Sequence, residues 1–332
     1  MKTALCERLG IEVPIILAPM GLASSPRLAA SVSNAGGLGT LAPWSMDVES
    51  LRRQVRETRS LTSRPFAVNL ITELPQEERL AACLEEGVPV ITFFWHDPYK
   101  LVPRAKASGA VVLHTVSSAK DARIAVDNGV DIIVAQGWEA GGHIRGTVAT
   151  LPLIPAVVDA VGSIPVVAAG GIADARGLAA ALSLGAAGAW IGTRFLASEE
   201  AAIHPEYRAR LLAATETDAV YFEELFDGGW PNAPHRVLRN STAVNWEAAG
   251  RPPSGKRPGE GTVIAKSPTG GDILRYQAST PVAGVTGDVE GLSMWAGQSV
   301  GLVRKVQPAA DIVREINEGA DAILHRLARS AK

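Results

Sequence analysis

The chain has 332 residues, of which 47% are hydrophobic and 20% charged, a composition typical of a globular protein and not of a disordered one. Its 32 basic and 34 acidic residues leave a formal net charge of −2, which gives no general attraction to nucleic acid or to an anionic membrane. The two cysteines form no CxxC, so no metal site is expected. The sequence has no apolar run of about 20 residues, which predicts no membrane segment, and it has no secretory leader, which predicts a cytoplasmic protein.

Short apolar runs recur between residues 14 and 196, each followed by a polar or glycine-rich break and a helix-like segment. Most runs are continuous, as expected of parallel strands buried on both faces. The helix over 174–184 is clearest, with Asp174 as its N-cap. The pattern predicts an α/β protein built as a (β/α)8 TIM barrel. The alternative, an open doubly wound sheet, is disfavoured because no GxGxxG follows the first run. The runs are 14–19, 38–41, 66–70, 88–95, 111–116, 131–137, 165–172 and 188–196.

After residue 200 the alternation stops. Residues 201–250 are predicted to be mainly helical, with helices starting near His204 and Asn240. Residues 251–272, rich in proline, glycine and charge, predict a mobile flap at the rim of a cleft. Residues 308–329 have helical periodicity and are expected to close the barrel. The predicted domains are a barrel over 1–200 and 301–332 and an inserted substrate or lid domain over 201–300.

Active sites of this fold lie where strands end. Small or uncharged hydrogen-bonding residues dominate there, which suits a flat ligand with a polar edge. Glycines on two successive strands also predict a phosphate site, since a residue without Cβ lets backbone N–H groups approach an anion. The alternative is that these glycines only permit tight turns. The strand-end residues are Pro19, Met20, Asn69, Thr115, Gln136, Gly170, Gly171, Gly192 and Thr193.

The run Gln136 to His143, QGWEAGGH, places a histidine beside Gly141 and Gly142. A glycine-rich loop can bring an imidazole over a ligand, and histidine is the side chain best suited to exchange protons near neutral pH. The spacing of these residues alone is equally consistent with a histidine that has only a structural role.

These residues resemble a known family. AQGWEAGGH (135–143) is similar to the AQGxEAGGH motif of the nitronate monooxygenases, formerly called 2-nitropropane dioxygenases. The similarity extends over nearly the whole chain and is weakest from about 211 to 290. Further similar segments are PIILAPMG (14–21), SNAGGLG (33–39), PFAVNL (65–70), PVVAAGGIADARGLAAALSLGA (165–186), IGTRFLAS (191–198) and WAGQSVGLV (295–303).

The resemblance implies bound FMN. By it, His143 is the base or hydrogen-bond donor near the substrate, and Glu139 braces its own loop. Pro19 and Met20 would lie along the isoalloxazine, with Asn69 and Gln136 at its polar edge. Thr115, Gly141 and Gln298 would complete the cofactor site, with Gln298 reaching in from the inserted domain. The residues implied for the ribityl phosphate are Gly142, Gly170, Gly171, Gly192 and Thr193.

The chain also departs from the family. Gly146 stands one residue later than the glycine that often follows the histidine, and Trp295 replaces a tyrosine of many members. Trp295 predicts a larger or more apolar substrate pocket. His96, after the fourth strand, is a second substrate candidate, although Asp97-Pro98 reads as an ordinary turn. The roles of His235 and Arg239 stay open.

The resemblance favours FMN-dependent oxidation of alkyl nitronates by dioxygen, giving a carbonyl compound and nitrite. An FMN-dependent NAD(P)H reductase, acting on enoyl-acyl-carrier protein or quinone, is the alternative on the same barrel. A non-enzymatic barrel that binds a phosphorylated ligand is a third reading. The expected partners are a small substrate and dioxygen, with a homodimer possible and no nucleic acid or membrane involved.

Overall fold

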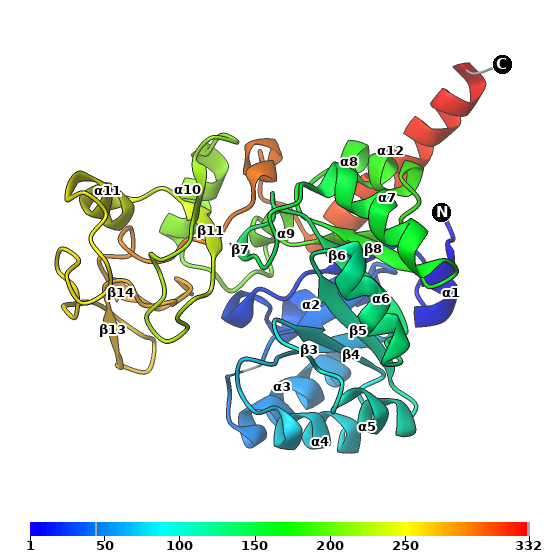
Figure 1. Ribbon diagram of the computed structural model, residues 1–332, viewed down its shortest axis with the longest axis horizontal. Coiled ribbons are helices and arrows are strands. Elements are labelled where there is room, and N and C mark those ends of the chain that lie inside the picture. Colours follow the sequence, from blue (N-terminus) through cyan, green and yellow to red (C-terminus); the bar gives the residue numbers. More distant parts are fainter. Residues whose placement is uncertain (44, 331–332) are drawn as a thin grey trace.

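The computed structural model describes residues 1–43 and 45–330 and contains a ring of eight parallel strands surrounded by helices (Figure 1). The ring closes between β1 and β2, where Ile16 bridges Leu38 and the Leu17 N–H donates to the Leu38 carbonyl at 2.9 Å. The predicted barrel is therefore confirmed, and the open sheet is excluded. The strands are β1 (Ile15–Leu17), β2 (Gly39–Leu41), β3 (Phe66–Ile71), β4 (Val90–Phe94), β5 (Val111–Val116), β6 (Ile132–Gln136), β8 (Val166–Ala169) and β9 (Gly188–Ile191).

Helices follow the strands on the outside of the ring. Asp174 caps α8 as predicted, because its carboxylate accepts from the N–H groups of Arg176 and Gly177 at 2.9 and 3.3 Å. The last helix, α12, packs against α8 and α2 and so closes the outer layer. Within the described ranges, every helix is too short or too polar to span a bilayer. The barrel helices are α2 (Pro26–Asn34), α3 (Val48–Leu61), α4 (Glu77–Glu85), α5 (Val102–Ala107), α6 (Ala119–Asp127), α7 (Thr150–Val161), α8 (Ala175–Ser183) and α12 (Ala309–Ser330).

One end of the barrel is plugged by apolar side chains. Leu5 and Leu9, on the short helix α1 (Ala4–Leu9), pack with strand residues such as Ile16 and Val90 and are buried. This packing fills the interior at the end where the strands begin. The active site of this fold lies at the opposite end, where the strands stop.

The inserted segment between β9 and α12 lies to one side of the barrel, next to β7 (Gly142–His143) (Figure 1). The helices predicted near His204 and Asn240 are present, and both residues are N-caps. The prediction of a mainly helical insertion is wrong, because the segment also forms strands of two to four residues, too short to show a periodic pattern. Its elements are α10 (Pro205–Ala213), β10 (Ala219–Phe222), β11 (His235–Leu238), α11 (Ser241–Ala248), β12 (Val263–Lys266), β13 (Asp272–Leu274) and β14 (Thr286–Gly287).

Residues 251–272 are folded and anchored. Arg257 is buried, and its guanidinium donates to the Asp227 carboxylate at 2.7 Å and the Leu225 carbonyl at 3.1 Å. It also pairs with Glu260 and lies over the Tyr276 ring at 4.5 Å. These contacts attach the segment to the inserted domain at Arg257 and Glu260, whereas most of its other residues are exposed. The mobile flap stays a prediction.

Candidate active site

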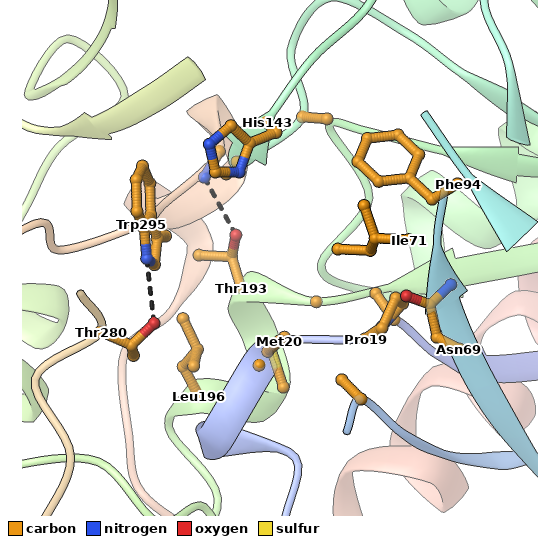
Figure 2. A pocket seen from close by; sticks show the side chains of 18 of the residues that line it. Pro19, Met20, Asn69, Ile71, Phe94, His143, Thr193, Leu196, Thr280 and Trp295 are labelled. Carbon is orange, nitrogen blue, oxygen red and sulfur yellow. Dashed lines mark hydrogen bonds between the residues drawn. The ribbon is translucent and has the colours of Figure 1, made fainter. Parts of the chain in front are cut away.

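A cavity of about 370 Å³ opens where the strands end, within the range of small-molecule sites. Figure 2 shows His143 and Trp295 on one side, Asn69, Ile71 and Phe94 on the other, and Pro19 and Met20 between them. The inserted segment supplies a wall from 228–230 and 277–280, which the sequence did not reveal. The predicted residues that line the cavity are Pro19, Met20, Asn69, Thr115, Gln136, Gly141, Gly142, His143, Gly170, Gly171, Gly192, Thr193 and Trp295.

Two amides, Asn69 on β3 and Gln136 on β6, line the cavity from strands that are separated by β4 and β5. The Asn69 amide donates to the Thr92 hydroxyl at 2.8 Å, and the Gln136 amide donates to the His143 carbonyl at 3.2 Å. The other polar atom of each, Asn69 Oδ1 and Gln136 Oε1, is buried without a hydrogen-bond partner. Buried polar atoms left unpaired are costly, so these positions fit the polar edge of a bound ligand.

His143 is placed by strand pairing between the barrel and the inserted segment. It lies on β7, which pairs antiparallel with β11, so that His143 stands opposite His235. Its ring stacks on Trp230 at 3.9 Å between centroids and lies 5.1 Å from the ring of Trp295. Its Nε2 is buried and has no hydrogen-bond partner. A ring nitrogen of His143 therefore stands unpaired in the wall of the cavity.

Burial disfavours protonation of both imidazoles at this junction. Burial lowers the pKa of His143 well below its usual value, and neighbouring His235 adds to this. His235 shares its Nδ1 with the Ala233 carbonyl at 2.9 Å, and its Nε2 accepts from the Phe226 N–H at 3.1 Å. Burial lowers the pKa of His235 to about 4. Because both ring nitrogens are engaged, His235 holds one tautomer and is unsuited to carry protons.

Stability should depend on pH through such buried histidines. Burial lowers the pKa of His114, on β5, from 6.5 to about 4. Between these values the unfolded chain binds more protons than the folded one, so the free energy of unfolding should decrease as the pH falls from 6.5 to 4. The loss is about 3 kcal/mol for one such histidine. Urea unfolding at several pH values measures it. His114→Gln should make this dependence shallower by about that amount, and the part that remains is expected from buried His143 and His235.

The glycines of the site serve different purposes. A Cβ on Gly141 would lie 2.4 Å from the Gly297 nitrogen, and one on Gly170 would lie 2.9 Å from the Gly137 carbonyl oxygen. Packing alone therefore requires both to be glycine. Gly142 has a φ of 72°, and a Cβ added to it would have no atom within 4 Å, so there is open space beside this glycine. Gly171, with φ of 74°, faces Glu139 at 3.5 Å.

Thr193 begins a short helix, α9 (Thr193–Leu196), and does not end the preceding strand as the sequence suggested. Its hydroxyl oxygen accepts from the Gly297 N–H at 3.0 Å, which ties the barrel to the inserted segment. The hydroxyl proton stays available for a ligand.

Two side chains fix the loop that precedes His143. The Glu139 carboxylate accepts from the Thr150 N–H at 2.8 Å and hydroxyl at 2.9 Å, which confirms that it braces its own loop. Buried Arg236, on β11, donates to the carbonyls of Trp138 at 2.8 Å and Ala140 at 3.2 Å. Sequence reasoning missed Arg236, because an arginine in a weakly patterned insertion carries no signal of burial.

The remaining candidates lie elsewhere. His96 is exposed and bonds Glu73 at 2.8 Å, outside the lining of the cavity. Gln298 is also outside it, and its N–H donates to the Glu139 carbonyl at 3.0 Å. His96 therefore does not face the substrate in this structure, and Gln298 does not reach in. Arg239 pairs with Glu247 away from the cavity.

A barrel with unpaired amides, glycines and an imidazole at its strand ends defines a small-molecule enzyme, and sequence comparison specifies the class. The sequence model of the nitronate monooxygenase family matches residues 2–80 and 72–319. The chain belongs to this family and is a flavin-dependent oxidoreductase.

Relatives within this group carry different activities. The nitronate monooxygenase of Paraburkholderia phytofirmans is 32% identical, covering 99% of this chain and 98% of its own. The (3aS,4S,5R,7aS)-5-hydroxy-7a-methyl-1-oxo-octahydro-1H-indene-4-carboxyl-CoA dehydrogenase of Rhodococcus jostii is 39% identical, covering 75% and 69%. Among solved structures, FabK from Thermotoga maritima has a TM-score of 0.83 at 34% identity, covering 99% of both chains.

Proposed function

We propose that the chain binds FMN and oxidises small nitroalkanes, as their nitronates, with dioxygen to a carbonyl compound and nitrite. The observation that carries this proposal is the buried, partnerless Nε2 of His143 in the same cavity as the unpaired oxygens of Asn69 and Gln136. The family and the Paraburkholderia relative support the choice of substrate.

In this proposal the barrel holds the cofactor. Pro19 and Met20 lie along its ring system, and Asn69, Thr115 and Gln136 bond its polar edge. Backbone and hydroxyl groups of Gly142, Gly171, Gly192 and Thr193 hold the phosphate. The bound flavin supplies the redox chemistry. Residues 201–300 form the substrate domain, with Trp295 as part of the wall.

His143 moves the proton. Its neutral Nε2 takes a proton from the carbon next to the nitro group, so that a C–H bond breaks and an N–H bond forms. The electron pair passes onto the nitro group. The resulting imidazolium and nitronate balance each other's charge, so the cavity gains no net charge from the transfer.

A reductase that takes electrons from NAD(P)H is the second candidate. It is favoured by the similarity to FabK and by the 39% identity to a dehydrogenase acting on a carboxyl-CoA. Anaerobic mixing experiments distinguish the oxidase from the reductase. The flavin-loaded enzyme is mixed separately with 2-nitropropane, its nitronate, propionate 3-nitronate and NADH. Bleaching of the flavin by a nitro compound supports the oxidase. Bleaching by NADH alone supports the reductase and contradicts the proposal.

Denaturation of the purified holoenzyme should release FMN and not FAD. The reason is that the chain has no dinucleotide fingerprint, while glycines at two strand ends suit a single phosphate. Chromatography of the heat-released flavin against both standards is the measurement. Recovery of FAD would contradict the assignment of the phosphate residues.

A further inference from the structure

Trp95, the residue directly after β4, has a backbone conformation that bulky residues rarely adopt. Its φ is 92°, in the left-handed region that favours glycine, and its side chain is buried. Such strain persists only where the surrounding contacts stabilise the residue by more than the strain costs, and it is common at functional sites. The contacts of the Trp95 ring therefore indicate what the strained turn does.

The turn at Trp95 sends neighbouring side chains in different directions. Phe94 lines the cavity (Figure 2), whereas His96 is exposed. Thr72 holds the backbone on both sides of the turn, because its N–H donates to the Phe94 carbonyl at 3.0 Å and its hydroxyl donates to the His96 carbonyl at 2.8 Å. The Trp95 ring packs in a buried cluster with Trp230, so the turn connects β4 to the inserted segment.

The His143 side chain is surrounded by aromatic rings. Trp230 stacks on it at 3.9 Å between centroids, and Trp295 lies at 5.1 Å. Trp95 approaches edge to face, with centroids 6.0 Å apart and planes at 79°, and meets Trp230 in the same way at 5.1 Å and 74°. Edge-to-face pairs are a preferred arrangement of aromatic rings. A hydrogen bond to one ring nitrogen often fixes an active-site imidazole, but Nε2 of His143 has no such partner.

Resting on the proposed function, we propose that Trp95 is a positioning residue for His143. Its strained turn sets the indole against the rings of His143 and Trp230, and this contact holds the imidazole in the orientation that removes the proton from a neutral nitroalkane. Trp95 lies outside the lining of the cavity, so its effect on the reaction passes through His143 and not through contact with a ligand.

A ratio of two rates reports on the position of the imidazole. A neutral nitroalkane must lose a proton to His143, whereas its pre-formed nitronate needs no deprotonation. We therefore compare kcat/KM for 2-nitropropane with kcat/KM for its nitronate. Trp95→Leu should lower the ratio of the first to the second about tenfold, since a small misplacement of a reacting group can lower a rate by about 100-fold. Trp95→Phe keeps an aromatic edge and should hold the ratio within about threefold of the wild-type value.

Trp246→Leu is the matched control. Trp246 is a buried indole of the inserted segment outside the cavity, and its N–H donates to the Pro252 carbonyl at 2.8 Å. The substitution should lower the melting temperature and leave the ratio unchanged. An unchanged ratio in Trp95→Leu, or an equal fall in Trp246→Leu, would overturn the proposal. If Trp95→Leu does not fold, Trp95→Met takes its place with the same expected fall.

Nuclear magnetic resonance tests the position of the ring without turnover. The chain has six histidines, so histidine-labelled holoenzyme gives a simple set of ring C–H signals, and His143→Gln identifies the signal of His143. Trp95→Leu should broaden or split this signal, because the imidazole then adopts more than one orientation. Trp95→Phe and Trp246→Leu should leave it single. A single sharp signal in Trp95→Leu would contradict the proposal. If the signal splits while His143→Ala leaves the ratio of rates unchanged, the nitronate function fails and the placement of the imidazole by Trp95 stands.

Discussion

His143→Ala is expected to retain flavin and to lower turnover of a neutral nitroalkane by about 10²–10⁴-fold, the usual contribution of a proton-transfer group. The His143 side chain lines the cavity with its Nε2 unpaired. The phosphate is proposed to be held by the loops after β8 and β9 and by the backbone of Gly142, and none of these groups is removed with the imidazole. Steady-state kinetics with 2-nitropropane and a flavin-binding titration measure the two parts of this result.

The substrate form provides the internal control. A pre-formed nitronate needs no deprotonation, so His143→Ala should affect it less than the neutral compound. His96→Ala, which removes an exposed imidazole outside the cavity, should leave both rates unchanged. Equal losses for nitroalkane and nitronate would assign His143 to stacking between Trp230 and Trp295 instead of proton transfer. An unchanged rate would make it structural.

The barrel and its strand-end residues were predictable from the sequence because buried parallel strands are continuous apolar runs with abrupt ends. β3, for example, is buried along its whole length, and Asn69 lies within its last three residues, so the run itself brings that amide close to the carboxyl end of the strand. The same reasoning correctly brought Gln136, Gly171 and Gly192 into the cavity. The carboxyl ends of the strands of a barrel lie at the same face, regardless of the conformation of the loops that follow them.

The inserted wall was not predictable, since it depends on long-range pairing of short strands. Trp230 reaches His143 only through the turn that precedes β11, and no local pattern marks it. His96 failed as a candidate because the chain turns at Trp95, whose φ is 92°. The Trp95 ring is buried 6.0 Å from that of His143, and His96 is left exposed. Gly141 was assigned to the cofactor, although close packing against Gly297 already requires it.

Arg236→Met is expected to lower kcat about 10-fold or more at temperatures where the variant is folded, by releasing the loop that carries His143. The guanidinium binds the carbonyls of Trp138 and Ala140, and Arg236 stands opposite Gly142 in the β7–β11 pairing. Its removal leaves buried carbonyls unpaired, which should also cost about 3 kcal/mol or more of unfolding free energy. Lysine has fewer, non-planar donors, so Arg236→Lys should recover only part of the rate.

Arg257→Met separates positioning from stability. Arg257 is likewise a buried guanidinium in the inserted segment, but its partners are Leu225, Asp227, Ser254 and Glu260, none of them on the loop before His143. We expect both methionine variants to lower the melting temperature. Arg236→Met alone should reduce kcat, while the KM for 2-nitropropane changes little. Equal losses of kcat in the two variants would show that Arg236 acts only by holding the inserted segment together. A normal kcat in Arg236→Met would show that β-strand pairing and the Glu139–Thr150 contacts suffice to place the imidazole.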